Sequence, residues 1–367
     1  MGESYPLLTI DVAKLRQNVR RTLDLGRQHG VDFCFVTKCF RSNPELLREM
    51  ARAGARAFGD TRVENLQRME GIAEERWCLR IVPPSEAAAI VRHSEVSLNS
   101  SWTALEALHA AAREQGRRHE VILMLELGDR REGFMAEDLL AVLRRMRTEL
   151  PHLVCRGLGA NFNCLHGVIP EAGVLQRLLD LGAAWRAESG QVLPCYSGGN
   201  SGSMYLLTEG RLPAGINNLR VGEFYLYGHD CSYFRPVEGM ARDLFILEAE
   251  VIESGVKPSL PEGPQGLDAY ARRLNVENYG DIRRILLAVG GQDLGPRPLE
   301  ALDTQLRYVA ASGDHALFDV SASERSFQVG DIVQLKLAYS SLNYAFLTPY
   351  VRIRLRDGTD CRWLEEK

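Results

Sequence analysis

Short β-rich runs alternate with helical stretches from the N-terminus to about residue 230, and this alternation constrains the fold more than any other feature of the sequence. It is typical of parallel βαβ units, in which each helix returns the chain to the start of the next strand. We expect strands over residues 32–36, 55–59, 77–82, 95–98, 121–126, 155–161, 192–196 and 218–223. We expect helices over residues 44–53, 84–91, 104–115, 136–150 and 172–188. Eight such units predict a closed (β/α)8 TIM barrel.

After Tyr233 the pattern changes to strands separated by turns, with no long helix among them. A chain of 367 residues is also longer than a single average core would need. We therefore expect a barrel domain over residues 1–233 and a C-terminal β domain over residues 234–367, and the extreme N-terminus is a candidate for a further strand of the second domain.

The charge balance and the cysteines exclude several classes of protein. A formal net charge of −4 argues against nucleic acid as a partner. No apolar run is long enough to cross a membrane, and the N-terminus lacks a signal-peptide layout, so we expect a cytoplasmic protein. The eight cysteines are scattered without a CxxC pair, which argues against a zinc knuckle and a disulfide framework. We also expect no metal at His229-Asp230-Cys231, because three adjacent loop residues rarely all reach one ion.

In a barrel of this type the active site lies at the C-terminal ends of the strands, so the residues that follow each apolar run are the informative ones. Lys38 follows the first strand, in FCFVTK. It could be a solvated lysine that starts a loop. A semi-buried lysine with a lowered pKa is also what Schiff-base chemistry requires.

A glycine- and serine-rich segment, SGGNSGS, follows the seventh strand, and Arg220 lies in the eighth. Such segments are often simple turns. Glycine also lets backbone amides wrap an anion, serine adds hydroxyl donors, and the loops after strands seven and eight are the usual phosphate site of these barrels. The location therefore favours a phosphate site.

At this point the sequence resembles the fold-type III pyridoxal-phosphate (PLP) enzymes, and within them the alanine racemase family and its ornithine racemase-like branch. The resemblance covers nearly the whole chain. It rests on motifs that occur in the family's order: TIDVAKLRQN, VTK, FGDTRVENL, LGDRREGF, SGGNSGS, GINNLRVGEFYLYG, GQD, SGDHALFDV, VGDIV and AYSSLNYAFLTPYV.

The resemblance implies a PLP cofactor and a role for several residues that hold its phosphate. Lys38 would form the Schiff base and act as acid and base on one face of the substrate Cα. Ser201, with the backbone amides of Gly222 and Glu223, would bind the phosphate, and Asn200 is a further cofactor-binding residue. A further hydroxyl would come from Tyr339 of the C-terminal domain.

The same resemblance assigns residues around the cofactor ring. Arg131 would contact the phenolic oxygen and the substrate carboxylate, and Asn161 stands where alanine racemases have a histidine under the ring. Arg220 would face the pyridine nitrogen. Since a guanidinium cannot accept a proton, that nitrogen would stay unprotonated, which weakens the electron sink and suits racemisation better than transamination.

The second acid/base departs from the alanine racemase pattern. The tyrosine expected on the opposite face is replaced by the segment 290–293 (GGQD), and the usual modified lysine by Met124. His315 and Cys164 are our candidates, and we favour His315 because its reference pKa is near neutral. A histidine that stabilises its turn through Asp314 and an inert thiol are the alternative interpretations.

We therefore expect a racemase for a basic amino acid such as ornithine or lysine, acting as a homodimer with sites at the interface. The distal ammonium group of such a substrate would require a carboxylate, for which Glu223, Asp293 and Asp314 are candidates. The expected substrate-binding residues are Arg131 and Asp314. Another fold-type III enzyme (a D-amino-acid lyase or aldolase, or a decarboxylase) and a non-catalytic PLP-binding protein are the alternatives.

Overall fold

The computed structural model describes residues 4–268, 270–273 and 277–364. The chain packs as two compact units, which we call the barrel unit and the β unit. The barrel unit runs from Lys14 to Arg242, and the β unit combines the segment up to Ala13 with the chain from Asp243 onward. Residues 234–242, beyond the division expected from sequence, pack with the barrel because side chains of helix α1 (Val12–His29) bind their backbone. Gln17 donates to Gly239 O (3.0 Å) and Asn18 to Ala241 O (2.8 Å).

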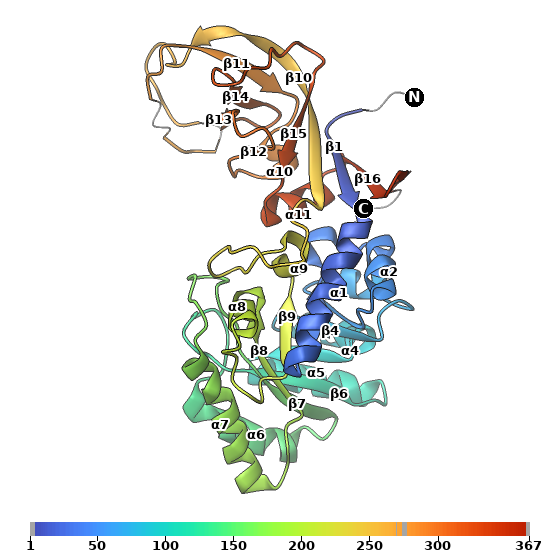
Figure 1. The fold of residues 1–367 in the computed structure, drawn as a ribbon. Helices are drawn as coiled ribbons and strands as arrows, with labels where there is room; N and C mark the ends of the chain where they lie inside the picture. The colour runs from blue at the N-terminus through green and yellow to red at the C-terminus, as the bar shows by residue number, and fades with distance from the viewer. Residues whose placement is uncertain (1–3, 269, 274–276, 365–367) are drawn as a thin grey trace. The chain divides into compact units, whose positions relative to one another are not determined.

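Eight parallel strands close into a barrel, so the expected (β/α)8 fold is confirmed (Figure 1). The last strand pairs with the first through Asp32↔Asn218 and Phe35↔Val221. The barrel strands are β2 (Asp32–Val36), β3 (Ala57–Asp60), β4 (Glu75–Cys78), β5 (Val96–Asn99), β6 (His119–Met124), β7 (Leu153–Gly159), β8 (Cys195–Asn200) and β9 (Asn218–Val221). Inside the barrel, a buried cluster contains Cys34, Trp77, Val96, Leu98, Ile122, Met124 and Cys195.

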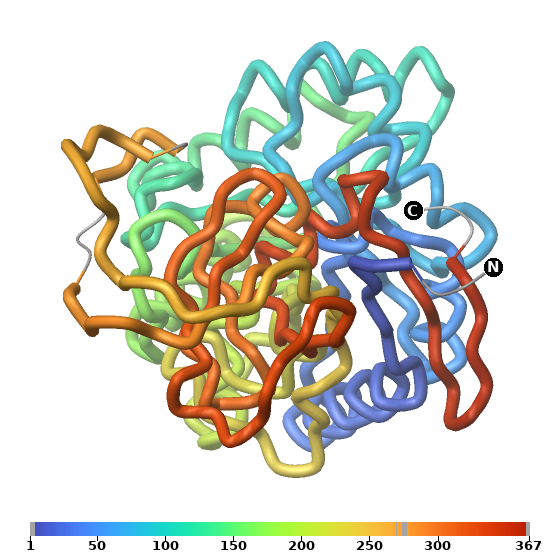
Figure 2. The backbone as a smooth tube through the Cα atoms, turned by 90° about the horizontal axis from the view of Figure 1, so that it is seen from above, coloured from blue at the N-terminus to red at the C-terminus, as the bar shows by residue number. Residues whose placement is uncertain are grey.

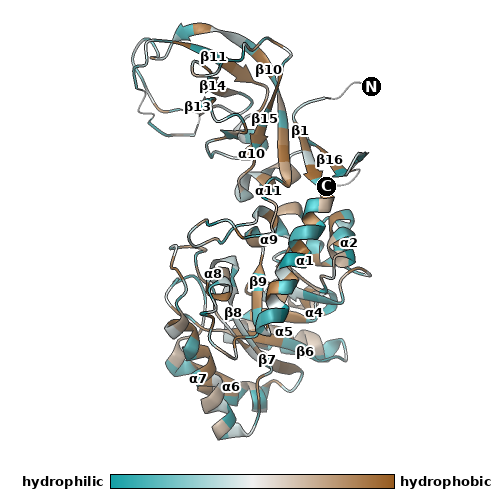
Figure 3. Cartoon of the chain, viewed as in Figure 1, coloured by the Kyte–Doolittle hydropathy of each residue, from teal (hydrophilic) through white to brown (hydrophobic). Residues whose placement is uncertain are grey.

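Helices follow the strands, and their ends carry recognisable signals. Asn43 caps α2 by accepting from the amides of Glu45 and Leu46, and α7 ends at Gly190 in the left-handed conformation. The helices are α1 (Val12–His29), α2 (Pro44–Arg52), α3 (Val63–Arg68), α4 (Ala87–His93), α5 (Trp102–Glu114), α6 (Ala136–Glu149), α7 (Ala172–Ser189), α8 (Met204–Thr208) and α9 (Glu223–Tyr227). Figure 3 shows both teal and brown residues along α1, the amphipathic pattern of a helix with one buried face. Among the described residues, no helix combines the length and apolarity that crossing a bilayer requires.

Several features of the barrel differ from the sequence prediction. Helices α1, α3, α8 and α9 were not expected, and the helix expected over residues 84–91 is divided into a 3-10 turn (η2, Pro84–Glu86) and α4. The strand expected to end at residue 196 continues to Asn200, so the first glycines of SGGNSGS lie in β8. A side chain at Gly198 would place its Cβ 2.5 Å from Ile216 Cγ2, which explains why glycine is needed within a strand there.

The β unit is a mostly antiparallel sheet with the order β13-β14-β11-β10-β1-β16-β17. The N-terminal strand β1 lies between β10 and β16, and Figure 2 shows it in blue beside the red C-terminal strands. The elements are β1 (Leu7–Asp11), β10 (Phe245–Pro258), β11 (Asp281–Leu287), α10 (Gly291–Leu294), β12 (Glu300–Ala301), β13 (Arg307–Ala311), β14 (Ala316–Asp319), β15 (Ile332–Lys336), α11 (Tyr339–Leu347), β16 (Arg352–Asp357) and β17 (Asp360–Trp363).

Candidate active site

Lys38 lies at the C-terminal end of β2, where it begins the 3-10 turn η1 (Lys38–Phe40) with its side chain exposed. The two residues after this turn, Arg41 (φ 54°) and Ser42 (φ 50°), are both in the left-handed region. Non-glycine residues adopt this conformation only where the surrounding structure enforces it. The backbone next to Lys38 is therefore held in a specific, costly shape.

Asp60, at the end of β3, provides the contacts that hold this turn. Its Oδ2 accepts from Ser42 Oγ (2.9 Å) and Thr37 Oγ1 (3.3 Å), the residues that flank Lys38 and η1. Its Oδ1 accepts from Asn65 Nδ2 (3.0 Å). Burial raises the pKa of Asp60, and the hydrogen bonds from Asn65 and Ser42 oppose that rise. Sequence reasoning missed this role, although the position of Asp60 at a strand end, in FGDTRVENL, was the available signal.

The segment after β8 has the form of an anion site. Asn200 Oδ1 accepts from Gly202 N (2.8 Å), and Ser201 is buried at the start of η3 (Ser201–Ser203). Ser201 Oγ accepts from Gly222 N (2.9 Å) and Phe224 N (3.3 Å). A Cβ at Gly202 would lie 3.0 Å from both Asn163 and Asn200, so the backbone here is closely enclosed. We call Ser201, Gly202, Gly222 and Glu223 the anion cradle; hydroxyls and backbone amides are the groups that bind phosphate in proteins, and here the amides of Gly202 and Gly222 donate to Asn200 and Ser201.

Arg220 lies in β9 and is 4% exposed. Its guanidinium donates to Ser197 Oγ and to Ala160 O, both at 2.6 Å. Ser197 Oγ in turn donates to Asn218 Oδ1 (2.6 Å). Burial lowers the pKa of Arg220 from its usual value. The side chain is thus a fixed, buried group at the C-terminal side of the barrel.

Arg131, Asn161, Cys164 and Asn200 come together at the ends of β6, β7 and β8. Asn200 Nδ2 lies 3.2 Å from both Asn161 Oδ1 and Cys164 Sγ. With the Asn161 amide turned over, its oxygen accepts from Arg131 Nη2 at 3.3 Å. Arg131 also pairs with Glu132, and that hydrogen bond raises the pKa of the arginine. These four sequence-predicted residues therefore form one cluster.

Asp129 joins the two loops that carry this cluster. It is 2% exposed, and its carboxylate accepts from Leu165 N (3.2 Å) and His166 N (3.3 Å). Its backbone oxygen lies 2.7 Å from His166 Nδ1. The sequence did not predict a role for Asp129, because its partners are far away in sequence. The motif LGDRREGF predicted a role for Arg131 only.

The remaining predicted residues lie in the β unit. Asp314 and His315 occupy the turn between β13 and β14 with exposed side chains, and Tyr339 is the first residue of α11. The GGQD segment packs on this turn: Gly291 N donates to Ser312 O (2.8 Å) and Gln292 N to Gly313 O (2.9 Å). Two motifs that were separate in the sequence, GGQD and SGDHALFDV, thus meet.

Glu223, His229 and Cys231 also converge beside the anion cradle. One ligand-type atom from each lies within 4.8 Å of the others, and His229 Nε2 is 3.4 Å from Glu223 Oε1. Asp230 faces away and accepts from Tyr233 N and from Arg235 (3.0 Å to Nε). Burial, with a smaller contribution from the charge of Glu223, raises the pKa of Cys231 well above its usual value. His229 and Cys231 therefore lie with Glu223, while Asp230, between them in the sequence, belongs to a different set of hydrogen bonds.

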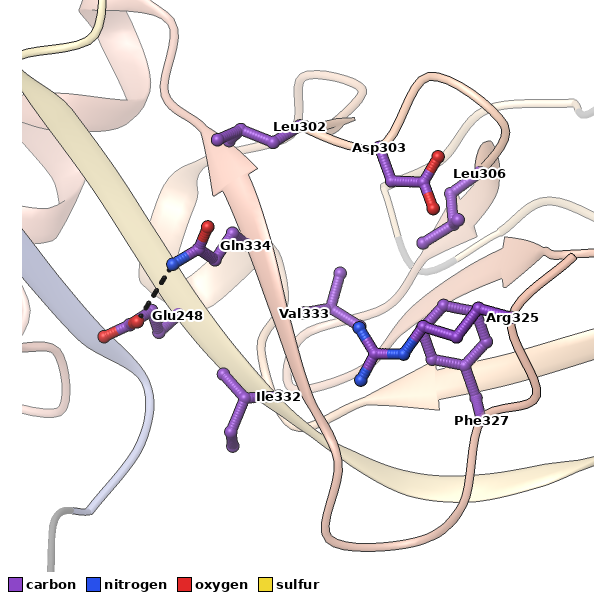
Figure 4. A pocket seen from close by; sticks show the side chains of 9 residues that line it. All are labelled: Glu248, Leu302, Asp303, Leu306, Arg325, Phe327, Ile332, Val333 and Gln334. Atoms are coloured by element: carbon purple, nitrogen blue, oxygen red, sulfur yellow. Dashed lines mark hydrogen bonds between the residues drawn. The ribbon is translucent and has the colours of Figure 1, made fainter. Parts of the chain in front are cut away.

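Two hollows lie apart from this cluster. One, of about 260 Å³, lies on the β unit, where Glu248 and Gln334 are hydrogen bonded (3.2 Å) above the side chains of Ile332 and Phe327 (Figure 4). The other, of about 940 Å³, is lined by residues at the N-terminal ends of the barrel strands, including Asp32 and Trp77. Catalytic residues of such barrels lie at the opposite strand ends.

Comparison with known proteins gives a consistent result. The family model described as alanine racemase, N-terminal domain, matches residues 10–230. The ornithine racemase of Acetoanaerobium sticklandii is 37% identical over 96% of this chain and 99% of its own length. The lysine racemase of Thermotoga maritima is 32% identical over 95% and 97%. The structure of an alanine racemase from Streptomyces lavendulae shares the fold, with a TM-score of 0.71, 19% identity and 98% of each chain covered.

Proposed function

The chain belongs to the alanine racemase family, and from this premise we propose that it is a PLP-dependent racemase that interconverts the L and D forms of ornithine or lysine. The observation that carries the proposal is the similarity, over nearly the full length, to one ornithine racemase and one lysine racemase. The two relatives that are similar over nearly their full length are racemases, and neither is a lyase, a decarboxylase or a non-catalytic PLP-binding protein.

The residues of the barrel fit a PLP cofactor. Ser201 and the amides of Gly222 and Glu223 would hold the phosphate. Lys38 would carry the cofactor, and it follows β2, the strand that pairs with β9. Arg220 would face the ring nitrogen as a buried cation. Because a guanidinium has no hydrogen-bond acceptor, it would leave this nitrogen unprotonated. When bound, the cofactor withdraws electrons from the Cα–H bond of the amino acid.

The chain's own residues then bind the substrate and move one proton. Arg131 would bind the substrate carboxylate, since a guanidinium can contact both oxygens of a carboxylate. Lys38 would take the proton from Cα on one face or return it there. Asp60 holds the turn that carries Lys38 through Ser42 and Thr37, which limits the positions that the amine can reach.

Racemisation requires a second proton donor on the opposite face, and His315 is our first candidate, followed by Cys164. His315 would enter a partner's site in a homodimer, with Tyr339 of the β unit reaching the phosphate. Both the dimer and a cytoplasmic location are proposals. Loss of α-proton exchange in His315→Gln with one enantiomer only would support the histidine, and the same result with Cys164→Ser would favour the thiol.

The function is tested by an absorbance spectrum from about 300 to 500 nm before and after borohydride, followed by deuterium exchange at Cα with a panel of amino acids. We expect a yellow protein, a reduced cofactor fixed on Lys38, and exchange with loss of optical rotation for ornithine or lysine. A colourless protein would contradict the cofactor, and a yellow one that exchanges no amino acid would contradict the racemase.

A further inference from the structure

We propose that Glu223 selects the substrate by binding the distal ammonium group of the basic amino acid. This inference rests on the proposed function and adds the residue that recognises the side chain. It concerns the Glu223 carboxylate, whereas the anion cradle uses only the backbone of this residue.

The structure separates Glu223 from the other two carboxylates that the sequence offered. Asp293 is 6% exposed, and its Oδ2 accepts from Gly290 N (3.1 Å), so it serves its own loop. Asp314 is exposed in the turn between β13 and β14. Neither is suited to bind an ammonium group. The carboxylate of Asp293 is buried and already hydrogen bonded, and that of Asp314 is exposed, where water screens its charge.

Glu223 is held differently. It begins α9 directly after Gly222, and its side chain is 29% exposed. Gly228 then ends the helix in the left-handed conformation (φ 63°) and turns the chain so that His229 returns to Glu223, at 3.4 Å. The imidazole is itself packed against Phe234, with ring centroids 5.1 Å apart. The carboxylate is thus half-buried, and among the described residues its one polar contact is the long one to His229.

The charge next to Glu223 gives this arrangement its selectivity. A phosphate held in the anion cradle would place negative charge near the Glu223 carboxylate, and like charges repel. An ammonium group would relieve the repulsion and form a charge-assisted hydrogen bond. A neutral side chain of the same length would remove water from the carboxylate without pairing it, which costs free energy. The site would therefore favour ornithine or lysine over their uncharged analogues.

The test compares charged substrates with their uncharged isosteres. Equilibrium constants are measured by spectral titration, and kcat/KM by polarimetry, for ornithine against norleucine and lysine against 2-aminoheptanoate, in which a methyl group replaces the ammonium. We expect Glu223→Gln to lower the preference for the charged member of each pair by roughly 10- to 100-fold, the effect of losing a hydrogen bond between charged groups. Glu209→Gln is the matched control, since its carboxylate has a similar exposure (31%) on the same unit.

A second variant keeps the inference testable if Glu223→Gln loses the cofactor. Glu223→Asp retains the charge but shortens the side chain by one methylene, and lysine is longer than ornithine by one methylene. We therefore expect this variant to keep its preference for charged substrates and to shift toward lysine. An unchanged ratio of lysine to ornithine in Glu223→Asp would by itself overturn the inference.

Two other outcomes have separate meanings. If wild-type protein acts on no basic amino acid, the proposed function fails and this inference with it; if wild type acts on them but Glu223→Gln discriminates equally well, only the inference fails. The cluster of Glu223, His229 and Cys231 could instead bind a metal ion. Dialysis against Zn²⁺ followed by metal analysis tests this alternative. Stoichiometric zinc that is lost in both Glu223→Gln and Cys231→Ser would identify a metal site and overturn the inference.

Discussion

Arg220 should decide which product the enzyme releases. We expect Arg220→Glu to increase the keto acid formed per racemisation event, because a carboxylic acid can share a proton with the cofactor ring and strengthen its electron sink. The thermal midpoint should fall too, since a carboxylate cannot donate to Ala160 O. The product ratio is therefore the readout, measured by coupled keto-acid detection. Arg220→Lys, which keeps the positive charge, is the control, and equal ratios in all three proteins would contradict the role.

At the residue scale the sequence predicted the groups that stand directly after strands, such as Lys38 and Ser201. It could not predict Asp60 or Asp129, because their function depends on hydrogen bonds to partners that are distant in sequence. The approach of His229 to Glu223 was also hidden, since it depends on the left-handed conformation of Gly228. Local pattern identifies which residue types are present, whereas these contacts are set by tertiary packing.

At the scale of the elements, His119 makes the join between β5 and β6 sensitive to acid. Its Nε2 is 2.9 Å from Ser97 Oγ, and burial lowers its pKa from 6.5 to about 4. Below pH 6.5 the unfolded chain binds a proton that the folded protein does not, so stability falls as the pH falls from 6.5 toward 4. The loss reaches about 3 kcal/mol at most. Denaturant titrations across this range should show a flatter dependence in His119→Gln, and an equal slope would contradict the assignment.

The contact between GGQD and the β13–β14 turn gives a second prediction at this scale. In Gly290→Ala the new Cβ would lie 2.3 Å from Gly313 O, so the two segments must separate. We expect a loss of about 1–3 kcal/mol in the free energy of unfolding, measured by denaturant titration. Gly255→Ala is the control in the same unit, because a Cβ there meets nothing within 4 Å. Equal stabilities of the two variants would show that the contact is not maintained in solution.

The eight barrel strands were predictable because alternation of apolar runs and helices is a local pattern. The boundaries of the strands were less predictable. Strand β8 continues through Gly198 and Gly199, although a glycine-rich segment on its own predicts a turn. The short helix α9 was not expected, since Phe224, Tyr225 and Leu226 favour β structure in isolation, and its first residue, Glu223, was placed at the end of the expected strand over residues 218–223. Packing against the rest of the barrel decides such cases.

At the scale of the whole molecule, bound cofactor should stabilise the barrel. A ligand that binds only the folded state adds about 2.7 kcal/mol at a hundred times its dissociation constant. We expect the thermal midpoint to fall on removal of PLP and to recover on its return, with a smaller recovery in Ser201→Ala. The control is Ser189→Ala, whose hydroxyl donates to Trp185 O away from the anion cradle. Equal recovery in the two serine variants would contradict the assigned phosphate site.

The position of β1 has a consequence for biosynthesis. This strand leaves the ribosome first, yet its neighbours in the sheet, β10 and β16, begin only at Phe245 and Arg352. The barrel can close while β1 still has both edges unpaired. Such edges can pair with other strands, so this part of the nascent chain is open to aggregation until β16 has been made.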